Sequence, residues 1–180
     1  MKYVIPFFLF NLCSYLAVGQ HSNKQVPDAS ATINWLSLDE VQTQMKLLPK
    51  KVYMDIFTDW CVWCRQMEKK TFTNPHVIEY MNEHYYAIRL DAETADSLVF
   101  KGKKYGRLSG RKTNELAATF MNNKLTFPTS VFFDERFTNP QPVPGYLDVP
   151  TIEMILKYIA TNQHKSIPFD KYKDDFKGTW

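Results

Sequence analysis

Two cysteines, Cys61 and Cys64, are the side chains of this 180-residue sequence with the clearest capacity for chemistry. They lie three positions apart in the segment DWCVWC, and a tryptophan precedes each of them. The pair could form a structural disulfide, half of a metal site, or a redox-active dithiol. As a structural bridge it would close a loop of only four residues, for which the chain-entropy estimate is roughly 2 kcal/mol. A long-range bridge would contribute more, so a purely structural role suits this pair poorly.

A metal site at these cysteines would lack ligands. A closed structural zinc site takes four protein ligands, and Cys61 and Cys64 supply only two of them. His76 and His84 are eight positions apart, and the sequence has no second cysteine pair. The other two histidines fall in segments that we expect to be flexible. We therefore expect no metal and interpret the histidines as ordinary surface residues.

The redox interpretation uses more of the local sequence. Cys61 follows an apolar strand candidate and opens a helix candidate. The unpaired N–H groups and partial positive charge at a helix N-terminus favour a thiolate, so Cys61 should be the nucleophile. Cys64 lies one turn further in, on the same side, and should be more buried. It could attack the mixed disulfide and release the substrate.

Asp55 interrupts the apolar run of residues 51–57. A carboxylate in a buried strand is unfavourable unless it has a partner or a function. The strand could place it beneath the helix start, behind Cys64, where desolvation should raise its pKa. There it could accept the proton of Cys64 as that thiol attacks. The alternative is a structural aspartate bonded to backbone or water.

The surrounding pattern predicts an α/β fold. A strand–helix–strand start implies a parallel pair with a right-handed crossover, and a later hairpin-like pair adds antiparallel edges. We therefore expect a central mixed sheet of about four to five strands with helices on both faces. Strands are predicted at residues 51–57, 85–91, 129–134 and, as an edge, 143–148. Helices are predicted at 37–48, directly after the cysteines, from Asn74-Pro75 to His84, at 113–122, and finally after Asp148.

The N-terminal segment has the pattern of a secretory signal peptide. Lys2 precedes an apolar stretch that is short for a membrane span, and small residues suit cleavage before Gln20. An uncleaved anchor is the alternative. We divide the chain into a signal peptide (1–19), a flexible leader (20–34), a folded domain (35–162) with an insertion at about 92–112, and a C-terminal tail (163–180).

Export leaves Cys61 and Cys64 as the only cysteines of the mature chain, because Cys13 lies in the predicted signal peptide. Thiols outside the cytosol tend to pair. These two must therefore pair with each other, with another protein, or with a metal. The 22 basic and 19 acidic residues give a net charge of +3 without long runs, so we expect no nucleic-acid or membrane-surface binding.

The segment VYMDIFTDWCVWCRQMEKKTF resembles the active-site region of the thioredoxin superfamily. Residues 60–91 resemble more closely secreted thioredoxin-related proteins that are similar to the C-terminal domain of the bacterial transmembrane thiol–disulfide interchange protein. The likeness spans about residues 35–160 and implies a thioredoxin-like fold. It also implies a cis bond between Phe127 and Pro128, with Pro128 facing the active site and docking the substrate backbone.

The sequence departs from general thioredoxins between the two cysteines, where Val62-Trp63 replaces Gly-Pro. This difference bears on redox potential and substrate preference. Trp60 and Trp63 are candidates for substrate contact together with Phe127, with core packing as the alternative for Trp60. Arg89 occupies roughly the place of a lysine that thioredoxins carry near the buried acid.

These observations together predict an exported thiol–disulfide oxidoreductase, periplasmic or extracellular, that exchanges electrons with protein disulfides. The dithiol is the redox centre, so no cofactor is expected. The expected partners are protein thiols and disulfides, and the family and compartment imply a membrane electron donor. We expect a monomer. The alternative is a non-catalytic module of the same fold that binds proteins or acts as a holdase, which the insertion and the aromatic tail would suit.

Overall fold

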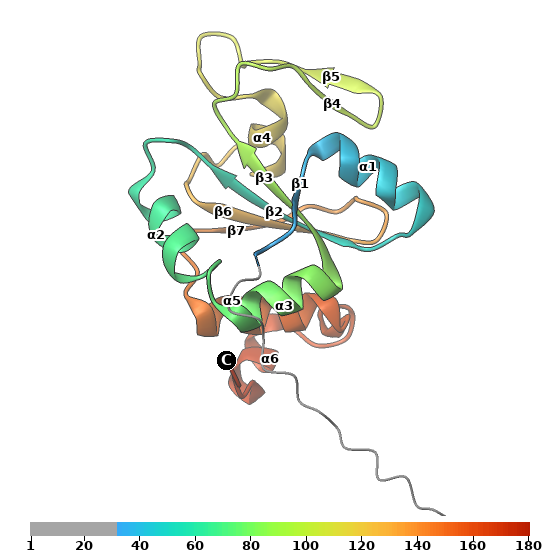
Figure 1. Cartoon of the computed structure of the whole chain (residues 1–180), viewed down its shortest axis with the longest axis vertical. Coiled ribbons are helices and arrows are strands. Elements are labelled where there is room, and N and C mark those ends of the chain that lie inside the picture. The colour runs from blue at the N-terminus through green and yellow to red at the C-terminus, as the bar shows by residue number, and fades with distance from the viewer. Residues whose placement is uncertain (1–31) are drawn as a thin grey trace, which may run out of the picture.

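The computed structural model describes residues 32–180, so the predicted signal peptide and most of the predicted leader lie outside the described residues (Figure 1). The predicted α/β fold is confirmed. A mixed sheet has the strand order β1-β3-β2-β6-β7, in which β1, β3 and β2 are parallel and β6 and β7 are antiparallel to their neighbours. Its strands are β1 (Trp35–Leu36), β2 (Lys51–Phe57), β3 (Tyr85–Asp91), β6 (Thr129–Phe133) and β7 (Gln141–Pro144).

Local signals in the sequence set the starts of the main helices. Ser37 and Glu40 form a capping box at α1, Asn74 caps α3 ahead of Pro75, and Asp148 caps α5. These side chains satisfy backbone N–H groups that have no partner within the helix. The helices are α1 (Leu38–Leu47), α2 (Val62–Lys70), α3 (Pro75–His84), α4 (Glu115–Phe120), α5 (Val149–Ala160), α6 (Phe169–Asp175) and a 3₁₀ turn at Gln163–Lys165.

Side chains of β2 alternate between two hydrophobic cores, one on each face of the sheet. Val52 and Met54 pack in a core with α1 and α4, whereas Tyr53 packs in a core with α2, α3 and α5. Helices therefore cover both faces, as predicted. Because successive strand residues point to opposite faces, Asp55 lies on the same face of β2 as Tyr53. This is the face that carries α2, the helix that begins after Cys61.

Several elements differ from the sequence prediction. The strand predicted at 143–148 is β7, which begins at Gln141 and ends at Pro144, before Gly145 turns the chain with φ of 99°. Two short elements were not predicted: β1, and a hairpin of β4 (Leu98–Phe100) and β5 (Lys103–Tyr105) between β3 and α4. In this hairpin Leu98, Phe100 and Tyr105 pack against the α1–α4 core.

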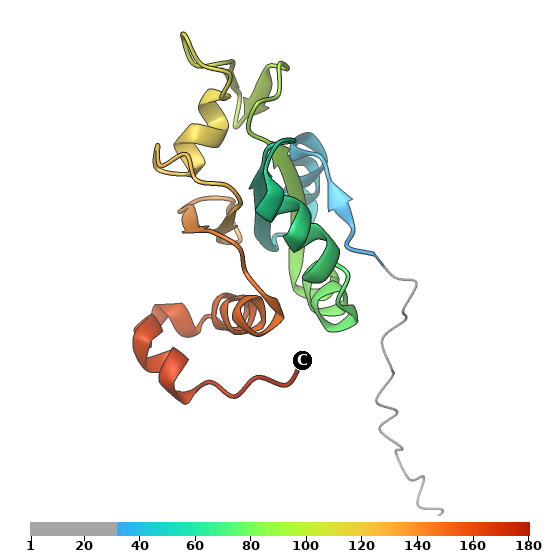
Figure 2. The same ribbon diagram turned by 90° about the vertical axis from the view of Figure 1, so that its left-hand side faces the viewer.

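The helix after Asp148 is not the last one, because the C-terminal segment forms α6 and then returns toward α3 (Figure 2). The carboxylate of Glu153, a buried residue of α5, accepts hydrogen bonds from the backbone N–H groups of Thr179 and Trp180. The Trp180 ring packs on Tyr80 of α3, with a centroid distance of 5.4 Å. The end of the chain is thus held against two helices. Between residues 32 and 180, no helix has the length and apolar character needed to cross a membrane.

Candidate active site

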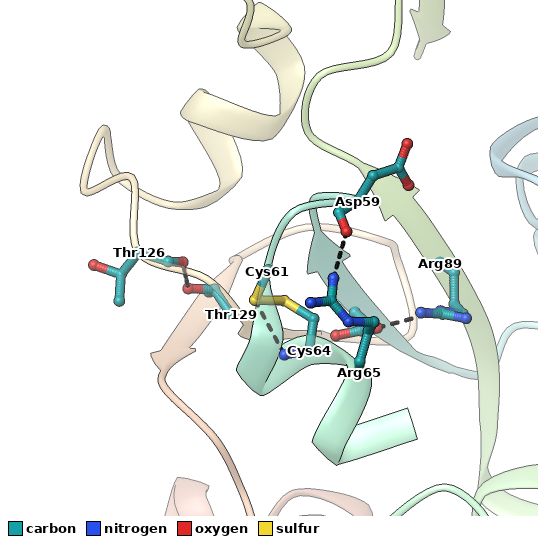
Figure 3. Close-up of a disulfide and its surroundings, with 8 residues drawn as sticks. Asp59, Cys61, Cys64, Arg65, Arg89, Thr126 and Thr129 are labelled. Carbon is teal, nitrogen blue, oxygen red and sulfur yellow. Dashed lines mark hydrogen bonds and ion pairs between the residues drawn. A yellow bond between two sulfur atoms is a disulfide. The ribbon is translucent and has the colours of Figure 1, made fainter. Parts of the chain in front are cut away.

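Cys61 and Cys64 form a disulfide at the N-terminal end of α2 (Figure 3). Cys61 is the N-cap residue of this helix, as the sequence predicts. Its Sγ accepts a hydrogen bond from the backbone N–H of Cys64 at 3.0 Å, and its own N–H donates to the carbonyl of Thr58 at 3.1 Å. A helix N-terminus stabilises negative charge. Once the disulfide is reduced, this position favours a thiolate at Cys61.

The two cysteines are almost equally buried, with 4% of Cys61 and 3% of Cys64 exposed. The prediction that Cys64 is more buried is met only marginally in the disulfide form. Burial therefore does not separate the two cysteines. Position on the helix distinguishes them instead. Trp60, Val62 and Trp63 around them are each about 60% exposed and form an apolar surface next to the disulfide.

Asp55 is 2% exposed on β2. Burial raises its pKa to about 6, and the neighbouring Arg89 guanidinium opposes part of that rise. Oδ2 accepts a hydrogen bond from Nε of Arg89 at 3.3 Å, whereas Oδ1 is buried without a hydrogen-bond partner among the described residues. An acid with this pKa and one open oxygen can accept a proton near neutral pH.

Arg89 links the buried acid to the helix that carries the cysteines. It lies on β3 directly beside Asp55 in the parallel register, and its Nη1 donates to Oε1 of Glu68 on α2 at 2.8 Å. The guanidinium also lies 4.5 Å from the ring centroid of Phe57. Sequence analysis placed Arg89 near the acid but missed Glu68. The spacing could have indicated this contact. Glu68 follows Cys64 by four positions, so it lies one turn later on the same side of α2.

The predicted cis bond between Phe127 and Pro128 is present. It immediately precedes β6, and Figure 3 draws Thr126 and Thr129, on either side of it, in the surroundings of the disulfide. The Phe127 ring packs edge-on against Trp60 with a centroid distance of 5.7 Å. The structure therefore brings the segment before β6 and the segment around the cysteines together.

Trp63 contacts a residue that the sequence analysis did not single out. Its ring lies 5.7 Å, centroid to centroid, from that of Tyr146, just after β7. The exposed tryptophans of the cysteine loop thus contact two other parts of the chain: the half-buried Phe127, which precedes the buried Pro128, and the half-buried Tyr146 after β7. Among residues 32–180, no group of three or more His, Cys, Asp or Glu side chains could hold a metal ion.

Comparison with known proteins places these features in a family. The family Thioredox_DsbH, described as a protein of unknown function (DUF255), matches residues 18–165. The thiol:disulfide interchange protein DsbD of Actinobacillus pleuropneumoniae is 29% identical over 155 residues, covering 81% of this chain and 24% of that protein. DsbD of Escherichia coli K12 is 27% identical over 124 residues, covering 67% of this chain and 19% of that protein. The chain thus spans about a fifth to a quarter of these relatives.

Solved structures agree on the fold. A DsbH oxidoreductase has a TM-score of 0.52 at 19% identity, over 81% of this chain and 96% of that one. A putative disulphide isomerase from Bacteroides thetaiotaomicron has a TM-score of 0.52 at 21% identity, over 77% and 98%. At these identities the likeness establishes the thioredoxin fold alone. The chain belongs to the Thioredox_DsbH family, has a thioredoxin-like fold with a C-x-x-C disulfide, and has thiol:disulfide interchange proteins among its homologues.

Proposed function

We propose that this protein is an exported thiol–disulfide oxidoreductase that exchanges two electrons with protein disulfides through Cys61 and Cys64. The observation that carries the proposal is the disulfide at the N-terminus of α2, with the buried, half-satisfied carboxylate of Asp55 on the face of β2 that α2 covers. A structural bridge would need neither the helix terminus nor an acid with a raised pKa.

Reduction of a substrate disulfide begins with the Cys61 thiolate. It attacks one substrate sulfur, a Cys61–substrate disulfide forms, and the other substrate sulfur leaves as a thiolate and takes up a proton. The Cys64 thiol then gives its proton to Asp55 and attacks Sγ of Cys61. The Cys61–Cys64 disulfide forms, and the second substrate sulfur leaves as a thiolate that is protonated in turn. The dithiol gives two electrons to the substrate; of the two protons that the substrate thiolates take up, one is the Cys64 proton that Asp55 releases and the other comes from the solvent.

The apolar surface gives these steps a place to bind substrate. Pro128 would dock the substrate backbone beside the disulfide, and Trp60, Trp63 and Phe127 would contact its side chains. The exposure of both tryptophans supports this assignment, because apolar side chains this exposed often mark a binding surface. The bulky Val62-Trp63 pair between the cysteines would narrow the range of substrates relative to a Gly-Pro pair.

Operation outside the cytosol requires a source of electrons. A dithiol that acts repeatedly as a reductant must be reduced again after each cycle, and the oxidising environment does not do this. We propose a membrane-bound thiol–disulfide donor, in keeping with the interchange proteins among the relatives. Protein thiols and disulfides are then the partners on both sides of the cycle.

Trapping of the intermediate tests the mechanism. In the source cell, a Cys64→Ser variant should accumulate mixed disulfides through Cys61, because the resolving thiol is gone. The matched control is Cys61→Ser, which should trap none. Equal trapping by both variants, or none by either, would falsify the assigned order of attack.

The exposed tryptophans also suit a non-catalytic protein-binding or holdase module, the second candidate function. Insulin reduction with dithiothreitol separates the two. The enzyme should accelerate insulin precipitation well above the Cys61→Ser variant. A module should show no such difference and should still suppress aggregation of an unfolded protein when both cysteines are replaced.

A further inference from the structure

A second candidate binding site lies at the opposite end of the sheet from the disulfide. A cavity of about 890 Å³ opens between β7, α5 and the segment that follows α5. Phe133, in its wall, pairs with Val52 at the start of β2, whereas the disulfide follows the other end of β2. Five residues of strand separate these ends, which is roughly 17 Å at the usual rise. The cavity is thus distinct from the thiol site.

The interior of the cavity is apolar. Strand residues form one wall and α5 the other, with Phe169 of α6 closing a side; the apolar lining includes Phe132, Val143, Ile155, Tyr158, Ile159 and Phe169. Its volume falls in the range of small-molecule sites, about 300–1,000 Å³. Such a space favours an alkyl or aromatic body.

The polar groups of the cavity favour an anion rather than a cation. Its two carboxylates are already engaged: Asp134 accepts hydrogen bonds from Thr138 and Asn139, and Glu135 pairs with the buried Lys51. Lys165 has no acidic partner among residues 32–180. A cationic ligand would therefore meet only carboxylates that are already paired, whereas an anion would meet the Lys165 ammonium group. This group forms no ion pair among these residues and only adds to the lowering of the pKa of the nearby Glu135 by Lys51.

One buried atom of the lining also lacks a partner. Nδ1 of His164 is buried and makes no hydrogen bond in the described part of the chain. Burial lowers the pKa of this imidazole, which favours the neutral ring. This nitrogen has almost no accessible surface, so Lys165 is the group that would meet the head of an anion in the cavity.

We propose that this cavity binds a small amphipathic anion, with its alkyl or aromatic body between β7 and α5 and its acidic group at Lys165. The site is independent of the thiol chemistry. It would let the protein hold such a ligand while its disulfide face is free for a protein partner.

Calorimetric titration of the full-length protein with decanoate, below its micelle concentration, tests the proposal. We expect one molecule bound per chain. Lys165→Glu should weaken binding roughly three- to tenfold, since an attractive exposed charge becomes repulsive. Ile159→Trp, which fills the apolar space, should abolish it. Both variants should keep the wild-type rate of insulin reduction, which shows that they are folded.

Decylamine is the matched probe, because it carries the same chain with a cationic head. Binding of decylamine as tight as that of decanoate would overturn the anionic assignment. Absence of decanoate binding by the wild type would overturn the site itself. Binding that survives Ile159→Trp but is lost in Trp63→Ala would place the ligand on the disulfide face and would equally refute the proposal.

Discussion

Nε of Arg89 lies 3.3 Å from Oδ2 of Asp55, and the two residues stand side by side on neighbouring parallel strands. The guanidinium leaves the second carboxylate oxygen unpaired, and its Nη1 donates to Oε1 of Glu68. Three influences therefore act on the pKa of Asp55: almost complete burial raises it, the Arg89 cation lowers it, and the more distant Glu68 anion raises it. Their balance raises its pKa to about 6, because desolvation outweighs the attraction to Arg89.

Replacing Asp55 with Asn should alter stability in a pH-dependent way. The folded chain holds the Asp55 proton more tightly than the unfolded chain, where the pKa is about 3.8. The tighter binding of this proton stabilises the folded state. The stabilisation is fully present below the unfolded pKa and is lost as pH rises through about 6. The free energy of unfolding of Asp55→Asn, measured relative to that of the wild type, should therefore increase by on the order of 1–3 kcal/mol as the pH rises from 4 to 8. Urea unfolding across this range measures it.

The matched control for that change is Asp59→Asn, an exposed aspartate in the cysteine loop. It removes the same charge from an exposed site and so reports the general effect of that charge on the stability curve. If Asp55→Asn and Asp59→Asn gave parallel curves, the raised pKa of Asp55 would be wrong.

The neighbours of Asp55 should shift its pKa in opposite directions. Arg89→Gln removes the cation that opposes desolvation, so the pKa of Asp55 should rise further. Glu68→Gln removes an anion that raises it, so the pKa should fall. Carboxyl NMR titration of the three proteins reads the order directly, with Glu79→Gln on α3 as the control that should leave it unchanged. Shifts of the same sign in both variants would contradict the arrangement.

Cys61 should react before Cys64 in the reduced protein. Its place at the helix N-terminus stabilises the thiolate, so its pKa should lie below the usual value of about 8.5. Iodoacetamide at pH 6.5, followed by peptide mass spectrometry, should label Cys61 at least about tenfold faster than Cys64. The single variants Cys61→Ser and Cys64→Ser give the two rates separately. Similar rates would remove the basis for naming Cys61 the attacker.

The tryptophans should matter for large substrates and not for small ones. Trp60→Ala and Trp63→Ala should slow reduction of a protein disulfide by roughly three- to tenfold, while the rate with a small aromatic disulfide changes less than twofold. Because both side chains are about 60% exposed, stability should change by less than about 1 kcal/mol. Leu48→Ala, an exposed apolar residue after α1, is the control. Equal losses with both substrates would place the tryptophans in a different role.

Local signals explain why much of the fold could be predicted. The capping box at Ser37, the Asn74-Pro75 helix start and the apolar run 51–57 each fix one element without long-range information. The two-residue strand β1 has no such signal and exists because β3 offers an edge to pair with. The hairpin at Leu98–Tyr105 lies among glycines and lysines, and its packing on α1 was not visible in the pattern.

The residue types and spacing of the candidate site could be predicted from the sequence, whereas the contacts between its elements could not. The cysteine pair and Asp55 follow from residue type and spacing, and the segment before β6 follows from the family resemblance. The contact of Arg89 with both Asp55 and Glu68 required the register of two strands and the rotation of a helix. The nearly equal burial of Cys61 and Cys64 depends on what covers the bridge, which spacing does not specify.

Adding a methyl group at Gly178 should weaken the contact between the C-terminal residues and Glu153 of α5. A Cβ at Gly178 would lie 2.9 Å from Oε2 of Glu153, and that carboxylate is fixed by Lys157, Thr179 and Trp180. Gly178→Ala should therefore accelerate amide exchange at Thr179 and Trp180 by about tenfold or more while leaving the sheet amides protected. Gly106→Ala, where an added Cβ meets nothing within 4 Å, is the control. Unchanged exchange in Gly178→Ala would mean that the contact is too weak to hold the end of the chain.

β7 forms one margin of the sheet, and two of its four residues, Pro142 and Pro144, have no backbone N–H. An edge strand with unpaired N–H and C=O groups can pair with a strand of another chain. Proline at the edge is one of the features that prevent such pairing. Because neither proline nitrogen can donate a hydrogen bond, β7 is a poor template for an added strand, and this disfavours edge-to-edge association of the sheet.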